Sequence, residues 1–227
     1  MTKENKLIYF GVFPGLVFQL IGAILYFVIF AESGFAQAIY SATKILILIW
    51  PLVWWMGVGL LWRMHARPER AVSFGYGLLA GIAIALLMLS TFFLFQDFFA
   101  QFAPQFLQKA QELNFLEHYI LFAVFLSLAH SLIEEYYWRW FIFRGLMLKF
   151  QPVTAALIGS IAFASHHFIV LSQFFPFWIT MLFGTAIIGI GLFWCWLYYK
   201  TKSLLGPWIS HIFADVAIMI AGYFLLF

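Results

Sequence analysis

Long apolar runs follow one another along the chain, separated by short polar connections. A helix needs about 20 apolar residues to cross roughly 30 Å of hydrocarbon. Because backbone groups in lipid must pair within their own segment, these runs predict helices, and the short alternating segments of a β-barrel are not visible. The predicted spans are Leu7–Ala31, Ala42–Trp62, Phe74–Phe95, His118–Phe143, Pro152–Leu171, Phe174–Tyr199 and Leu204–Phe227. We therefore expect an all-α polytopic membrane helix bundle with about seven transmembrane helices.

The composition indicates that a lipid bilayer surrounds most of the chain, because 65% of the 227 residues are hydrophobic and only 9% are charged. Soluble domains are about a quarter charged. The formal net charge of +3 reflects Lys and Arg in short loops, so we expect no nucleic-acid partner. The single cysteine, Cys195, cannot form an internal disulfide, and we expect it to be a small buried hydrophobe. With no repeat, linker or low-complexity tract, residues 1–227 are expected to form a single integral membrane domain.

The charged loops predict the orientation of the chain. Lys and Arg gather in every second connection, which the positive-inside rule assigns to the cytoplasm. The apolar run from Leu7 is too long for a signal peptide, so we expect a retained first helix and a cytoplasmic N-terminus. A bacterial cytoplasmic (inner) membrane is the expected location. The residues concerned are Lys3, Lys6, Arg63, Arg67, Arg70, Arg144, Lys149, Lys200 and Lys202.

Gln96–Glu117 is the one long polar connection, and its apolar residues recur near helical spacing. This pattern predicts an amphipathic helix on the membrane surface. The apolar positions are Phe98, Phe102, Phe106, Ala110 and Leu113.

Ionisable residues inside the spans gather in three late helices. Such groups are costly in lipid and generally mark functional sites. Residues 118–227 are therefore expected to carry the motifs and the catalytic helices, with the earlier spans as a scaffold. The ionisable residues are His130, Glu134, Glu135, Arg139, His166, His167, His211 and Asp215.

Glu134 and Glu135 are neighbours on a helix, so their side chains point about 100° apart. Glu135 and Arg139 are four residues apart and can pair on one face, as a support for the site. Glu134 lies on the side of His130 and Trp138 and needs a partner from another helix.

The histidines of the later spans are the available partners for Glu134. A carboxylate beside a neutral imidazole can take a proton from water and direct that water at a carbonyl group. His211 and Asp215, also four residues apart, can orient one another and stabilise a developing oxyanion. For His130 and His166, an ordinary interhelical hydrogen bond is the alternative interpretation.

Other chemistries remain as alternatives. Two histidines and two carboxylates are acceptable zinc ligands, so a zinc-dependent hydrolase is one of them. A non-catalytic scaffold or a proton-linked transporter is another, although the chain shows no pair of matching halves. The H-E-x-x-H and G-x-S-x-G patterns do not occur.

Three short motifs carry a family resemblance: E-E-x-x-x-R at Glu134–Arg139, F-x-x-x-H at Phe163–His167 and H-x-x-x-N/D at His211–Asp215. In this order they resemble the CPBP family, which includes CAAX proteases, bacteriocin-processing proteins and Abi proteins. The resemblance implies an intramembrane glutamic endopeptidase without metal or cofactor. Its substrate would be a protein or peptide at the bilayer, such as a C-terminal tail or a leader. Glu134 and His167 would activate water, His211 and Asp215 would line the oxyanion side, and Glu135 and Arg139 would support the site.

Two positions depart from the family pattern. The last motif more often ends in Asn, and an ionised Asp215 cannot donate to an oxyanion, so it must be protonated or serve only to orient His211. A Phe-Arg-Gly sequence at Phe143–Gly145 makes Arg144 a competitor to Arg139 for the supporting role.

Overall fold

The computed structural model describes residues 1–31, 33–58, 68–112 and 116–227. Every regular element in these ranges is helical, and seven helices are long and apolar enough to cross a membrane. The predicted all-α membrane bundle is thus confirmed, with the second span beginning at Ala36 rather than Ala42. Three residues used in the predictions lie outside the described residues. They are Arg63 and Arg67, from the prediction of orientation, and Leu113, from the prediction of the surface helix. The spans are Lys3–Ile29, Ala36–Trp54, Arg70–Leu94, Leu116–Leu146, Pro152–Leu171, Phe177–Thr201 and Leu205–Leu226.

Two compact units divide the chain. The first comprises Met1–Pro68 and Glu135–Lys202, and the second comprises Glu69–Glu134 and Ser203–Phe227. The boundary between Glu134 and Glu135 falls inside the continuous span Leu116–Leu146. The single domain stays a prediction.

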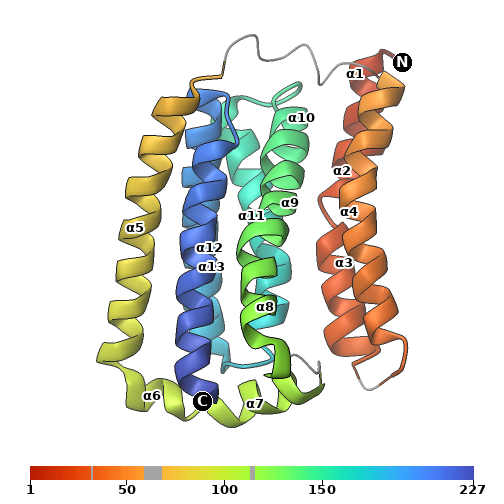
Figure 1. Ribbon diagram of the computed structural model, residues 1–227. Coiled ribbons are helices and arrows are strands. Elements are labelled where there is room, and N and C mark those ends of the chain that lie inside the picture. Colours follow the sequence, from red (N-terminus) through yellow and green to blue (C-terminus); the bar gives the residue numbers. More distant parts are fainter. Residues whose placement is uncertain (32, 59–67, 113–115) are drawn as a thin grey trace. The chain divides into compact units, whose positions relative to one another are not determined.

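The first unit begins with a span that alternates between α and π turns and then returns through α4 (Ala36–Val58). Helices α3 and α4 lie side by side (Figure 1). The indole Nε1 of Trp50 on α4 donates to the Gly11 carbonyl at 2.9 Å, which ties the two spans together. The elements of the first span are α1 (Lys3–Lys6), η1 (Leu7–Val12), α2 (Phe13–Gly15), α3 (Phe18–Ile24) and η2 (Leu25–Ile29).

The remaining helices of the first unit are η6 (Tyr136–Phe143, a π-helix), α10 (Arg144–Leu146), α11 (Pro152–Leu171) and α12 (Phe177–Thr201). Helix α11 packs along α12 and along α3. The Tyr137 hydroxyl donates to the Gly15 carbonyl at 2.6 Å and joins η6 to the first span. Helix α12 is capped by Lys202, whose φ of 54° is left-handed and whose Nζ lies 3.9 Å from the Tyr199 ring centroid.

The second unit pairs α5 (Arg70–Leu94) with α13 (Leu205–Leu226) over their length (Figure 1). Small residues allow this close approach, since Gly77 lies against the Gly206 backbone. The Gly206 N–H donates to Ser73 Oγ at 2.9 Å, and the Tyr119 hydroxyl donates to the Met219 carbonyl at 2.7 Å. The other elements are α6 (Gln96–Ala100), α7 (Ala103–Glu112), η4 (Leu116–His118), α8 (Tyr119–Phe125), η5 (Leu126–His130, a π-helix) and α9 (Ser131–Glu135).

The polar connection forms two helices, α6 and α7, rather than the one that the spacing predicted. Helix α7 is amphipathic: Ala110 is fully buried, while Lys109 Nζ pairs with Glu112 Oε2 at 2.7 Å on the polar side. Its place on a membrane surface stays a prediction.

Replacing Gly77 by alanine should destabilise the second unit. An added Cβ would overlap the Gly206 backbone, which cannot move aside as a flexible side chain would, and such overpacking typically costs about 1–3 kcal/mol. Gly75→Ala is the matched control on the same helix, because nothing lies within 4 Å of its added Cβ and alanine favours a helix. We expect the thermal midpoint, measured by far-UV circular dichroism in detergent, to fall for Gly77→Ala and to hold or rise for Gly75→Ala. Equal midpoints for the two variants would contradict the close packing of α5 on α13.

Candidate active site

A buried cluster in the second unit is centred on Glu134. One carboxylate oxygen, Oε1, lies 3.4 Å from His130 Nε2, and the other, Oε2, lies 3.9 Å from His211 Nε2. His211 Nε2 is also 3.7 Å from Asp215 Oδ1. The Glu134 side chain is only 2% exposed, and those of His211 and Asp215 are 7% and 12% exposed. Three of the four predicted catalytic residues therefore lie together, and His130 joins them.

Local helix geometry holds these groups in place. His130 and Glu134 are four residues apart, as are His211 and Asp215, so each pair shares one helix face. The Trp208 indole Nε1 donates to the Leu128 carbonyl at 3.1 Å, which fixes α13 against η5 one turn before His211. Glu134 is also flanked by π-helical stretches on both sides, a feature that is frequent at functional sites.

The residue types in the cluster suit proton transfer. Its contacts of 3.4–3.9 Å are longer than the usual N–H···O hydrogen bond. A buried carboxylate between imidazoles can act as a proton acceptor, and an imidazole N–H can donate to a developing oxyanion. The nitrogen and oxygen atoms are also of the types that zinc accepts.

Glu135 and Arg139 form the buried ion pair that their spacing predicts. Arg139 Nη1 donates to Glu135 Oε1 at 3.0 Å, and the two side chains are 1% and 0% exposed. The guanidinium carbon lies 4.6 Å from the Phe163 ring centroid and 4.8 Å from that of Trp194, so aromatic faces complete its surroundings. Arg144 is placed differently, 5.6 Å from the ring centroid of Trp140. The pairing therefore selects Arg139 over Arg144 as the partner of Glu135.

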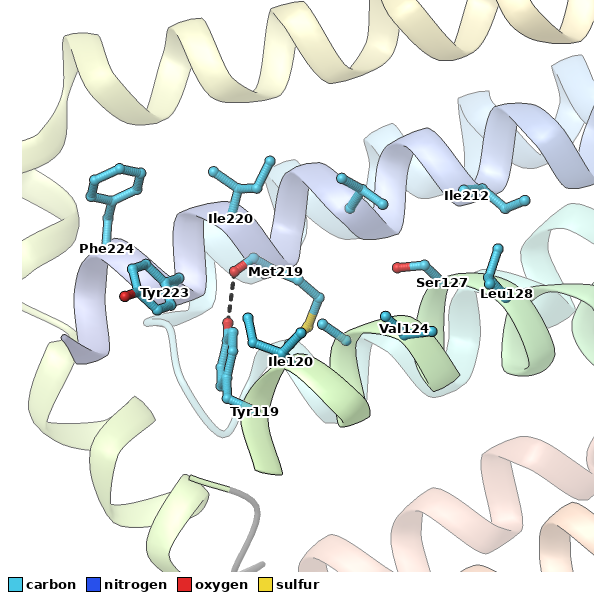
Figure 2. A pocket seen from close by; sticks show the side chains of 12 residues that line it. Tyr119, Ile120, Val124, Ser127, Leu128, Ile212, Met219, Ile220, Tyr223 and Phe224 are labelled. Atoms are coloured by element: carbon cyan, nitrogen blue, oxygen red, sulfur yellow. Dashed lines mark hydrogen bonds between the residues drawn. The ribbon is translucent and has the colours of Figure 1, made fainter. Parts of the chain in front are cut away.

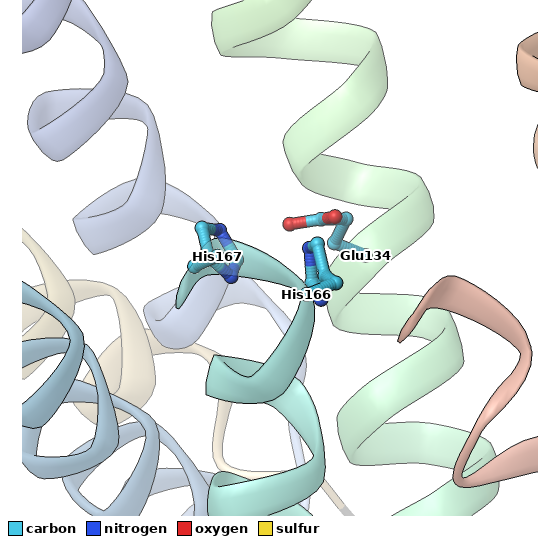
Figure 3. A group of neighbouring side chains, drawn as sticks. All are labelled: Glu134, His166 and His167. Atoms are coloured by element: carbon cyan, nitrogen blue, oxygen red, sulfur yellow. The ribbon is translucent and has the colours of Figure 1, made fainter. Parts of the chain in front are cut away.

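His166 and His167 are adjacent on α11, with ring centroids 4.0 Å apart (Figure 3). His167 Nδ1 lies 3.1 Å from the Phe163 carbonyl. Because a carbonyl only accepts, this contact places a proton on Nδ1, and Nε2 is then the basic nitrogen whenever the ring is neutral. Trp138 stacks on His166, with a centroid separation of 6.3 Å and an interplanar angle of 4°.

The predicted residues divide between the units. Glu134, His211 and Asp215 lie in the second unit, whereas Glu135, Arg139 and His167 lie in the first. The joint action of Glu134 and His167 stays a prediction.

The structure shows buried polar contacts for two residues to which the sequence analysis gave no role in the site. His130 faces Glu134 on its own helix, and the interhelical hydrogen bond of the alternative interpretation stays a prediction. Gln19, which sequence reasoning missed, is 3% exposed and accepts a hydrogen bond from Trp138. The sequence did contain a signal for Gln19, because it is a lone amide in a long apolar run.

An apolar groove of about 480 Å³ runs along the second unit between α8, η5 and α13 (Figure 2). Ser127, Leu128 and Ile212 line one end, close in the chain to His130 and His211. Tyr119 and Phe224 line the opposite end. The groove therefore runs along α8 and α13 to the level of the Glu134 cluster.

Comparison with protein families places the motifs in a known group. Residues 116–217 match the family described as type II CAAX prenyl endopeptidase Rce1-like. This segment is similar to the Rce1-like family. It contains all three motifs that carry the CPBP resemblance, which is thereby confirmed. No curated protein and no solved structure matches the chain. The Rce1-like match supports an integral membrane protein and, in general, an intramembrane endopeptidase.

Removing the Arg139 guanidinium should strongly destabilise the first unit. Arg139→Gln leaves the Glu135 carboxylate buried without its charge partner, and breaking a buried pair in this way typically costs about 3–5 kcal/mol. The double variant Glu135→Gln/Arg139→Gln should recover much of the loss, because no lone charge remains. Lys200→Gln, at an exposed position on α12, is the control.

Thiol labelling of Cys195 on heating measures this effect, because Cys195 is 2% exposed and lies in the same unit. We expect the labelling midpoint to fall most for Arg139→Gln. If the double variant is as unstable as Arg139→Gln, the unpaired charge of Glu135 is not the cause of the destabilisation.

Proposed function

We propose that this chain is a membrane-embedded endopeptidase of CPBP type, which hydrolyses a peptide bond by means of a Glu/His-activated water. The observation that carries the proposal is the buried Glu134 carboxylate between His130 and His211, inside the segment that matches the Rce1-like family. Such a group has the placement of a general base rather than of a surface charge.

The proposed reaction assigns each group a step. Glu134, assisted by His167, takes a proton from water while the water oxygen attacks the scissile carbonyl carbon. The negative charge that develops on the carbonyl oxygen is stabilised by an N–H of His211, which Asp215 orients. The proton then passes from Glu134 to the leaving amine as the C–N bond breaks. In this scheme Asp215 need not donate to the oxyanion, which accounts for Asp in place of the usual Asn.

The pairing of Glu134 with His167 is supported by the three motifs, which occur in order within the segment that matches the Rce1-like family. Glu135 and Arg139 act as positioning residues, because their buried ion pair fixes the helix directly after Glu134.

The substrate we propose is an apolar tail or leader of a protein at the membrane. The groove beside α13 supports an apolar segment, and the family's description names prenyl endopeptidases. We also propose a bacterial cytoplasmic membrane with the N-terminus inside, which the Lys and Arg pattern of the loops supports.

Cleavage should depend on the two predicted bases. In proteoliposomes, wild-type protein is incubated with membrane peptides that have apolar C-terminal tails, with and without a farnesyl group, and products are identified by mass spectrometry. Glu134→Gln and His167→Ala should each lower cleavage by at least about 10²-fold, the usual contribution of general-base catalysis. Glu117→Gln and His118→Ala, at exposed positions near the start of the same span, are the controls and should cleave normally.

Full activity in a folded Glu134→Gln variant would refute the proposal. The non-catalytic scaffold would be favoured by a different result. In that case neither the wild type nor any variant cleaves a peptide, but the variants lose a binding function that the wild type has.

A zinc-dependent form of the same hydrolase is the second candidate, because His130, Glu134, His211 and Asp215 offer two nitrogen and several oxygen donors. For the glutamic mechanism, we expect cleavage to persist after exhaustive chelation and elemental analysis to find less than stoichiometric zinc. Activity that disappears with the chelator and returns with added zinc would replace the glutamic mechanism by the zinc mechanism.

A further inference from the structure

Basic side chains gather in the first unit where two membrane spans end. Arg144 begins α10, the last turn of its span, and Lys200 and Lys202 lie at the end of α12. The Tyr198 hydroxyl accepts a side-chain hydrogen bond from Arg144, and the Tyr198 ring meets Phe143 edge-on with centroids 6.3 Å apart. These contacts bring the two span ends together. We call Arg144, Lys200 and Lys202 the basic triad.

The three cations of the basic triad are close enough to act on one another. Lys202 lies outside the spans, and its pKa is lowered by partial burial and by the like charges of Arg144 and Lys200. The Arg144 side chain is only 3% exposed, so water screens its charge poorly. An anion bound at the triad would offset the repulsion among the three positive charges and would be attracted by all of them.

The backbone of Lys202 is a second unusual feature of this place. Among the described residues, Lys202 is the one non-glycine residue with a left-handed φ, at 54°. Glycine is the usual residue at this position after a helix, because it adopts the left-handed conformation without steric cost. A lysine held there instead indicates that its side chain has a use.

The exposed face of α12 leads directly to the basic triad. Trp196, Tyr199 and Lys200 are three and four residues apart, so they share one helix face, and all three are exposed. The Lys202 Nζ lies 3.9 Å from the Tyr199 ring centroid. Aromatic residues at the end of a span lie at the level of the lipid headgroups. An apolar and aromatic surface that ends in cations matches a lipid with an anionic headgroup better than a free anion.

We infer that the basic triad binds the phosphate of an anionic phospholipid whose acyl chains lie along the Trp196 face of α12. Lys200 and Lys202 donate to the phosphate oxygens, and the buried Arg144 guanidinium adds positive charge behind them. Basic clusters beside membrane spans commonly bind anionic headgroups. The site is independent of the proposed hydrolase, since none of its residues belongs to the Glu134 cluster.

Native mass spectrometry of the full chain, released from detergent micelles, tests the site by titration with phosphatidylglycerol and, in parallel, with zwitterionic phosphatidylcholine. We expect the wild type to retain phosphatidylglycerol with a Kd several-fold lower than that for phosphatidylcholine. Lys202→Gly removes the charge and should raise the Kd for phosphatidylglycerol several-fold. Lys202→Arg keeps the charge and should bind as the wild type does.

Two controls separate the site from folding and from general surface charge. Because glycine adopts the left-handed backbone without strain, the lipid-free Lys202→Gly variant should hold or raise the midpoint of Cys195 labelling on heating. Lys6→Gln removes one exposed positive charge at the start of the first span and should leave the Kd unchanged. Equal losses of affinity in Lys6→Gln and Lys202→Gly would overturn the site, as would a wild type without preference for phosphatidylglycerol.

Inorganic phosphate distinguishes the lipid from a free anion. For a lipid site, added phosphate should displace little phosphatidylglycerol and should raise the labelling midpoint far less than the lipid does, since anything that binds the folded chain stabilises it. If phosphate alone displaces the lipid and raises the midpoint as much, the assignment to a phospholipid is wrong.

Discussion

Two adjacent carboxylates in the middle of one apolar helix impose the main constraint on this structure. Glu134 and Glu135 point about 100° apart, so a single set of neighbours cannot satisfy both. Glu135 is neutralised by Arg139 on its own helix, between the aromatic faces of Phe163 and Trp194. Glu134 faces imidazoles instead, which can exchange protons. The two neighbouring carboxylates therefore differ: Glu135 is held in an ion pair, whereas Glu134 faces groups that can exchange protons.

Helix periodicity explains what the sequence could predict. Pairs four residues apart are neighbours in any helix, so Glu135 with Arg139 and His211 with Asp215 followed from spacing alone. The spans followed equally from length and apolar content. Contacts between distant segments were beyond such reasoning. Neither the Gln19 contact with Trp138 nor the approach of His211 to Glu134 has a local sequence signature, because both depend on how separate helices pack.

The π turns before and after Glu134 also affect how related chains should be compared. Each added residue in a helix turns the positions beyond it by about 100°, and a π turn absorbs such an addition locally. Residue counts along Leu126–Phe143 are therefore a poor guide to angular position on this helix. An insertion or deletion within a π turn can preserve the direction of the glutamate while changing its distance in sequence from the start of the span. Alignments anchored on the motif itself will match equivalent faces, whereas alignments anchored on the helix ends will not.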